Sequence, residues 1–217
     1  MPLLAYCILK DDAGIEIPAT GVENSPIATV EGQGLRCLVS EYAHKSATDT
    51  FAAKTSALAF NRVLQDILRQ AGLIPFRFPT ILDSRAEILN HLRERADYYR
   101  QALDRLGDGV QMEVRLAIPE EPKGASGREL SGADYLHRRQ AARRTLAQTG
   151  ERMRDRLSAL IRDWRQRDTP AGLRCYALVA RSQVPGFLSL AREMQIPPQT
   201  TARVSGPWPA TEFMENQ

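Results

Sequence analysis

The side chains most often used in catalysis are scattered along this sequence. His44, His91 and His137 are far apart, and no His-x-x-x-His or Cys-x-x-Cys pair offers the ligand spacing of a metal site. Ser40 and His44 are close in the chain, but no Gly-x-Ser-x-Gly turn presents a nucleophile. We therefore expect no catalytic residue, no bound metal and no cofactor, and the sequence indicates a protein that is not an enzyme.

Two glycine-rich segments and one carboxylate pair are better explained by turns and loops than by phosphate binding or acid–base catalysis. Gly32-Gln33-Gly34 lies between two predicted strands, which is typical of a hairpin. Gly124-Ala125-Ser126-Gly127 does not directly follow a strand, as a phosphate-binding loop would. Glu120-Glu121 lies in a polar loop, where no apolar pocket would raise a carboxyl pKa.

Arginine is the one chemically active side chain that gathers in one region. The 217-residue chain has a formal net charge of +3, and its basic residues are concentrated between Arg138 and Asp168. One interpretation is the solvated face of an amphipathic helix; the other is a surface whose guanidinium groups bind an acidic partner. Four arginines at its start are our candidate partner-binding residues: Arg138, Arg139, Arg143 and Arg144.

The composition excludes several other classes of protein. Hydrophobic residues make up 43% and charged residues 25% of the chain, which are values of a globular protein. No apolar stretch approaches the roughly 18 residues of a membrane span. Three cysteines in apolar runs and the lack of a basic leader indicate a cytoplasmic protein.

The hydrophobic pattern predicts an α+β fold in two domains. The first domain, residues 1–118, is expected to be ferredoxin-like, with an N-terminal hairpin, helices over 50–71 and 84–106, and a strand over 110–118. Asp83 or Ser84 is the expected N-cap of the second helix, with Glu87 as the capping-box partner of Ser84. Residues 119–132 are expected to form a flexible loop.

The second predicted domain, residues 133–217, begins with a long amphipathic helix over 133–167. A strand over 173–180, a helix over 185–195 and a strand over 200–205 follow. A stiff tail with the sequence Pro-Trp-Pro comes last, and its Trp208 either fixes the tail to its own domain or docks a partner.

Two segments, Ile74–Thr80 and Ser205–Pro209, are too unusual to follow from packing alone. We consider them together with Gly132–Leu136, and the distinctive residues of the three are Arg77, Phe78, Tyr135, Gly206, Pro207, Trp208 and Pro209. In type and order they resemble motifs of the gas vesicle protein F/L family. Pro79, Ala210 and Thr211 depart from the family pattern, while Phe213 retains it.

The resemblance implies a non-catalytic accessory or minor structural protein of gas vesicles, located in the cytoplasm with these vesicles. Such a protein would bind the hydrophobic shell subunit and other accessory proteins during nucleation and assembly, with Phe213 as a further contact, and its self-association is left open. We expect no nucleic-acid or membrane partner. The alternative is a nucleic-acid-binding or regulatory module that uses an Arg-rich helix over 138–168.

Overall fold

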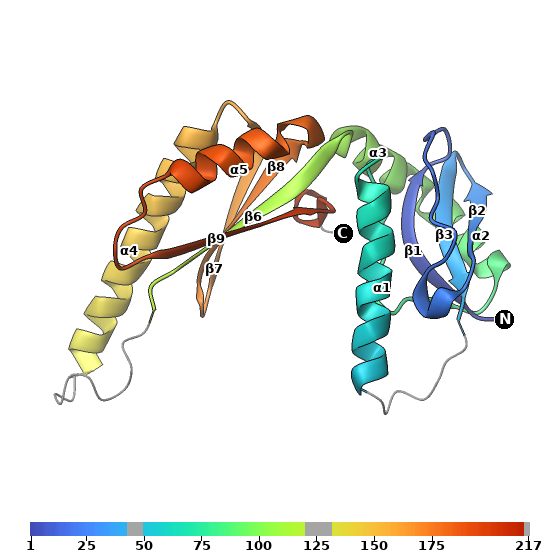
Figure 1. Ribbon diagram of the computed structural model, residues 1–217, viewed down its shortest axis with the longest axis horizontal. Helices are drawn as coiled ribbons and strands as arrows, with labels where there is room; N and C mark the ends of the chain where they lie inside the picture. The colour runs from blue at the N-terminus through green and yellow to red at the C-terminus, as the bar shows by residue number, and fades with distance from the viewer. Residues whose placement is uncertain (43–49, 120–131, 215–217) are drawn as a thin grey trace. The chain divides into compact units, whose positions relative to one another are not determined.

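The computed structural model describes residues 1–42, 50–119 and 132–214 of the chain, which form two compact units (Figure 1). The first unit contains Met1–Val110 together with Trp208–Gln217, and the second contains Gln111–Pro207. Helices and antiparallel strands are mixed in both units, so the predicted α+β class is confirmed.

An antiparallel sheet forms the centre of the first unit. Its strands are β1 (Leu3–Lys10), β2 (Ile27–Gly32), β3 (Leu35–Glu41), β4 (Ile74–Pro75) and β5 (Ile81–Leu82). The order is β2-β3-β1-β4, and β5 also pairs with β1. The expected hairpin joins β2 to β3, with Gln33 and Gly34 at positive φ in the turn.

Helices cover both faces of this sheet. Phe60 of α1 (Thr50–Leu68) stacks on Tyr6 of β1, with their ring centroids 5.1 Å apart. Residues of α2 (Arg85–Glu94) and α3 (Ala96–Leu106) share a core with the neighbouring strand position, Ala5. Since successive strand residues point to opposite faces, α1 and the α2–α3 pair lie on opposite sides of the sheet.

The helix predicted over 84–106 begins as expected but is divided in two. The Ser84 hydroxyl accepts a hydrogen bond from the Glu87 backbone N–H at 3.3 Å, which is the predicted N-cap. Arg95 then leaves the helical conformation, with φ −118° and ψ 15°, and separates α2 from α3.

The second unit is a four-stranded sheet with two helices. Its strands are β6 (Gly109–Ala117), β7 (Ile161–Thr169), β8 (Gly172–Ala180) and β9 (Thr201–Trp208), in the order β7-β8-β6-β9. The helices α4 (Gly132–Leu157) and α5 (Val184–Glu193) pack against one face of this sheet. Residues 111–117, placed in the first domain by the sequence, therefore belong to the second unit.

The prediction of one helix over 133–167 is wrong in its last third. α4 ends at Leu157, and residues 161–169 form β7, which pairs with β8 from Thr169↔Gly172 to Ile161↔Val179. Ile161 and Trp164 continue the helical spacing of α4, which explains the error. Pairing with β8 decides the outcome, because it satisfies the backbone and also packs both side chains against the core of the unit.

Candidate interaction surfaces

The first half of α4 is a basic helical segment whose described side chains are mostly exposed to solvent. α4 is buried at Leu146, Met153 and Leu157, whereas no described side chain of residues 132–145 is fully buried. Figure 1 shows this half, in yellow, leading up to the part of α4 that lies over the sheet. We call residues 132–145 the free half of α4.

All four candidate arginines lie on the free half of α4. Arg138, Arg139, Arg143 and Arg144 are exposed, as is Asp134, the one acidic residue of this segment. Arg139 and Arg143 are one helical turn apart, as an i,i+4 pair, and like charges at this spacing destabilise a helix. This segment can therefore gain stability by contact with an acidic partner.

The last three arginines of the predicted basic helix lie outside α4. Arg162, Arg165 and Arg167 belong to β7, an edge strand of the second sheet, and their side chains are exposed. The alternative function was based on one helix over 138–168, whereas α4 ends at Leu157 and residues 161–169 form a strand. Charged side chains on an edge strand also discourage pairing with another chain.

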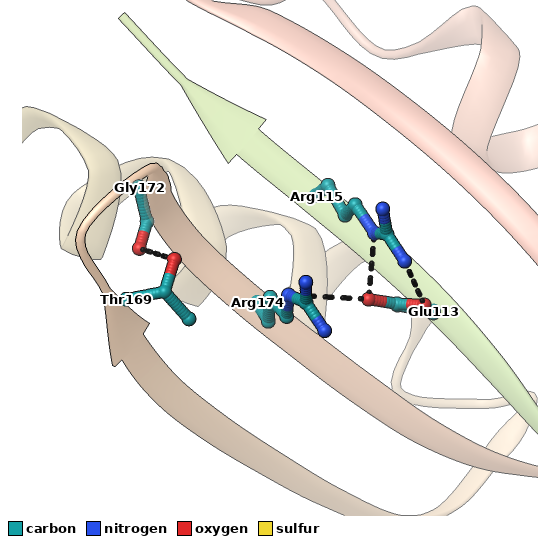
Figure 2. Close-up of polar contacts among 5 residues, drawn as sticks. All are labelled: Glu113, Arg115, Thr169, Gly172 and Arg174. Carbon is teal, nitrogen blue, oxygen red and sulfur yellow. Dashed lines mark hydrogen bonds and ion pairs between the residues drawn. The ribbon is translucent and has the colours of Figure 1, made fainter.

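A second arginine cluster lies on the sheet face opposite α4 and α5. Glu113 and Arg115 of β6 and Arg174 of β8 meet there (Figure 2). The two oxygens of Glu113 accept hydrogen bonds from Arg115 Nε at 2.8 Å and Nη2 at 3.1 Å. Sequence reasoning did not predict this cluster, because only the pairing of β6 with β8 brings Arg174 to Glu113.

The C-terminal motif is divided between the two units. Gly206, Pro207 and Trp208 are the last residues of β9, and Trp208 is half-buried. Gly206 has φ +125°, and a Cβ atom there would lie 2.8 Å from the Gln111 carbonyl oxygen, so only glycine fits without strain. Trp208 and the half-buried Pro209 belong to the first unit, whereas Gly206 and Pro207 belong to the second.

Phe213 is buried in the first unit. It is 2% exposed, and its carbonyl oxygen accepts a hydrogen bond from Arg105 Nη2 at 2.9 Å. A partner could reach the ring only after the tail had left the first unit. Burial explains its apolar character, and its expected role as a partner contact stays a prediction.

The other motif residues lie in different places. Phe78 packs against Phe60 of α1, with ring centroids 5.2 Å apart, whereas Arg77 is exposed and its carbonyl oxygen accepts a hydrogen bond from the Thr80 hydroxyl at 2.6 Å. Tyr135 belongs to α4, but its side chain is outside the described part of the chain. Residues 120–131 of the expected flexible loop are also outside it.

Burial and local contacts explain the state of the buried cysteines and of His91. Burial raises the pKa of the Cys37 and Cys175 thiols to about 12, so both stay protonated and unreactive. His91 Nε2 lies 2.7 Å from the Tyr99 hydroxyl. Across residues 1–42, 50–119 and 132–214, no group of His, Cys, Asp and Glu side chains could hold a metal ion.

Two further observations concern ligands and membranes. A pocket of about 200 Å³ lies on α3, lined by Tyr98, Gln101, Ala102 and Arg105. It is smaller than the roughly 300–1,000 Å³ of a typical small-molecule site. Within the described residues, each helix is too short or too polar to span a bilayer.

Two solved structures have the same fold. One is the gas vesicle protein GvpF from Anabaena sp. PCC7120, with a TM-score of 0.76 and 14% identity over 100% of this chain and 97% of that chain. The other is GvpF from Microcystis aeruginosa, with a TM-score of 0.73 and 15% identity over 99% of each chain. No curated protein matched this chain in sequence.

The sequence itself identifies the family. The model of the family described as gas vesicle synthesis protein GvpL/GvpF matches residues 2–215, which is nearly the whole chain. The resemblance seen in the three motifs is thereby confirmed. This chain belongs to the GvpL/GvpF family of gas vesicle synthesis proteins.

Proposed function

We propose that this chain is a non-catalytic accessory protein that binds the hydrophobic shell subunit and other accessory proteins during gas vesicle nucleation and assembly. Membership of the GvpL/GvpF family supports a gas vesicle role. The protonated thiols and the small pocket on α3 agree with a binding protein. We expect it in the cytoplasm, associated with gas vesicles.

The observation that carries the proposal is the free half of α4. Arg138, Arg139, Arg143 and Arg144 bring four positive charges to a segment that contains one carboxylate, Asp134, and no fully buried described side chain. Most of the stability of a helix in a protein comes from tertiary packing, and this half of α4 has little of it. Contact with acidic segments of a partner would supply that stability and relieve the repulsion between Arg139 and Arg143.

Capture of gas vesicle proteins by the tagged full-length chain tests this proposal. The bait is the wild-type protein, and the captured proteins are the shell subunit and the accessory proteins encoded with it, each expressed separately. Arg138→Glu, Arg139→Glu, Arg143→Glu and Arg144→Glu are combined in one variant. We expect it to lose about tenfold or more of the captured partner, because reversed charges at a contact repel the acidic segment.

A matched control separates the role of the surface from that of net charge. Lys54→Glu, Arg62→Glu, Arg93→Glu and Arg192→Glu change the charge equally at exposed positions outside the free half of α4. This control should capture as much partner as the wild type. Failure of the wild type to capture any gas vesicle protein would refute the function, and equal capture by both variants would refute the role of α4.

A further inference from the structure

The arginines in the free half of α4 lack the partners that two later arginines of the same helix have. Arg154 Nη2 lies 2.7 Å from Glu151 Oε2, and its Nε lies 3.6 Å from Asp155 Oδ1. Arg152 Nη2 donates a hydrogen bond to the Thr149 hydroxyl at 3.3 Å. Within the part of the chain that the structure describes, the four guanidinium groups of the free half form no hydrogen bond or ion pair. All their donors therefore remain for an external acceptor.

An exposed leucine lies among these arginines. Leu136 is 57% exposed, and the other exposed large hydrophobic side chains of the described residues are Met1 and Leu58. Arg139 and Arg143 follow Leu136 at positions i+3 and i+7, so the three side chains lie along one face of the helix. We call Leu136, Arg139 and Arg143 the outer stripe of α4.

The outer stripe lies beside the positions through which α4 packs on its own sheet. Arg139 is seven positions before the buried Leu146, so the two residues are almost in line along the helix. Leu146 and Met153 are covered by the second unit, whereas the outer stripe is exposed. An element bound to the outer stripe would therefore extend the packing of α4 beyond the part that its own sheet covers.

We propose that the outer stripe is the docking site of an acidic amphipathic helix of the partner. This inference rests on the proposed function and specifies which kind of segment the free half of α4 binds. An apolar side chain of the partner helix packs on Leu136, and carboxylates one turn away meet the guanidinium groups of Arg139 and Arg143. Arg138 and Arg144, on the two sides of the outer stripe, attract the acidic segment from a longer distance.

The spacing of the outer stripe fits a helix better than an extended segment. Side chains of the stripe recur about once per helical turn, which is about 5.4 Å along the axis. A partner helix repeats its own side chains at the same interval. In an extended chain, side chains on one side recur every two residues, at about 6.4–6.8 Å, and lose register with the stripe within two turns.

Leu136 favours an amphipathic helix over a simple polyanion. A nucleic acid backbone or an all-acidic peptide can contact the arginines but offers no apolar group to the leucine. Placing a phosphate or carboxylate against that side chain would remove water from the anion without compensation. Burial of Leu136 adds to affinity only where the partner also presents an apolar side chain.

A fluorescein-labelled peptide of three Leu-Glu-Ala-Ala-Leu-Glu-Glu heptads serves as the probe, and the full-length chain is titrated against it at about 0.15 M salt. Its leucines form one stripe of a helix, with glutamates beside them. The control peptide contains the same residues in an order that spreads the leucines around the helix. We expect it to bind about tenfold more weakly or less, because it cannot pair Leu136 and the arginines at once.

Variants of the outer stripe separate its apolar part from its charge. Leu136→Gln should weaken binding of the amphipathic peptide about threefold to tenfold, since the peptide leucine loses its apolar contact. Arg139→Gln combined with Arg143→Gln should weaken it about tenfold or more, because two charge-assisted contacts are lost. All three positions are exposed, so the circular dichroism spectrum of each variant should match that of the wild type.

The exposed positions of α1 supply matched controls. Leu58→Gln removes an exposed leucine, and Lys54→Gln combined with Arg62→Gln removes two exposed positive charges. Each control should change the affinity for the amphipathic peptide less than about twofold. Equal affinity of the wild type for the two peptides would overturn the proposal, as would unchanged affinity of Leu136→Gln. Tighter binding of single-stranded DNA than of the amphipathic peptide would also overturn it.

The outcome is distinguishable from that of the proposed function. If the wild type captures no gas vesicle protein but prefers the amphipathic peptide, and Leu136→Gln weakens this binding, the function fails and the outer stripe stands. If the wild type captures gas vesicle proteins but binds both peptides equally, and Leu136→Gln binds them as the wild type does, the function stands and the outer stripe is refuted.

Discussion

The phenol oxygen of Tyr6 lies 2.8 Å from the Oγ atom of Ser40 in the buried interior of the first unit. The same oxygen accepts a hydrogen bond from the Val22 backbone N–H at 2.8 Å. Burial raises the pKa of Tyr6, so its hydroxyl stays protonated and can donate to Ser40. One side chain of β1 thereby connects β3 to the segment before β2.

Removing this hydroxyl should destabilise the protein. Tyr6→Phe leaves the Val22 N–H and the Ser40 hydroxyl without their partner inside the protein, which costs about 1–3 kcal/mol. Urea unfolding at neutral pH measures the change in free energy. In the variant that also carries Ser40→Ala, the two changes should be clearly non-additive. Additive effects would show that the pair has no energetic coupling.

The turn between β7 and β8 should tolerate no side chain at Gly172. This glycine has φ +132°, and a Cβ atom there would lie 2.2 Å from the Leu116 carbonyl oxygen. The Thr169 hydroxyl also donates to the Gly172 carbonyl oxygen at 2.9 Å, which fixes the turn (Figure 2). We expect Gly172→Ala to lower the free energy of unfolding by at least about 1–3 kcal/mol.

Gly14→Ala is the matched control for this prediction. A Cβ atom at Gly14 would have no neighbour within 4 Å. Thermal or urea unfolding should therefore place this variant within about 0.5 kcal/mol of the wild type. A Gly172→Ala variant as stable as the control would show that the turn adapts.

The stability of the first unit should decrease as the pH falls below neutrality. Burial and the nearby charge of Arg95 lower the pKa of His91 below its ordinary value of 6.5, although Glu94 and Glu87 act in the opposite direction. The unfolded chain therefore binds a proton on this ring at a higher pH than the folded chain. The contribution of neutral His91 to the free energy of unfolding is fully present above about pH 6.5. It is lost as the pH falls through the pKa of His91 in the folded protein.

Urea midpoints at about pH 7.5 and about pH 5.5 test this dependence. His91→Gln should reduce the difference between the two midpoints, because it removes the group that takes up the proton. His137→Gln on the exposed face of α4 is the control and should keep the difference of the wild type. An unchanged difference in His91→Gln would assign the pH dependence to other groups.

The tail should stabilise the first unit through Phe213. This ring is 2% exposed, so Phe213→Ala should cost about 3–5 kcal/mol in the free energy of unfolding. Thr211→Ala, at an exposed position of the same tail, should cost less than about 0.5 kcal/mol. Normal stability of Phe213→Ala together with weaker capture of gas vesicle proteins would support the role as a partner contact.

Local signals in the sequence predicted many elements well. Alternation of apolar and polar residues predicted β6 almost to its ends, and the Ser84 cap with Glu87 placed the start of α2 correctly. These features depend on neighbours within a few residues, so the sequence contains them directly. The Gly32-Gln33-Gly34 turn was predicted for the same reason.

Long-range pairing could not be predicted in the same way. Residues 161–169 satisfy a helical spacing, and only their match to β8 across the turn at Gly172 makes them a strand. Arg174 reaches Glu113 only because β8 lies between β7 and β6. The exposure of the candidate arginines of α4 could be predicted because it follows from their own helix, whereas the contact of Arg174 with Glu113 depends on the sheet order.

Residues near both ends of the sequence build the first unit, and the second unit is inserted between them. During synthesis, the core of the first unit is therefore complete only after the buried residues Ala210 and Phe213 have left the ribosome. Most of the first unit leaves the ribosome much earlier. In a nascent chain, the core of the first unit would therefore stay incomplete while the second unit is synthesised and folds. Only copies synthesised beyond Phe213 would therefore have the complete core of the first unit.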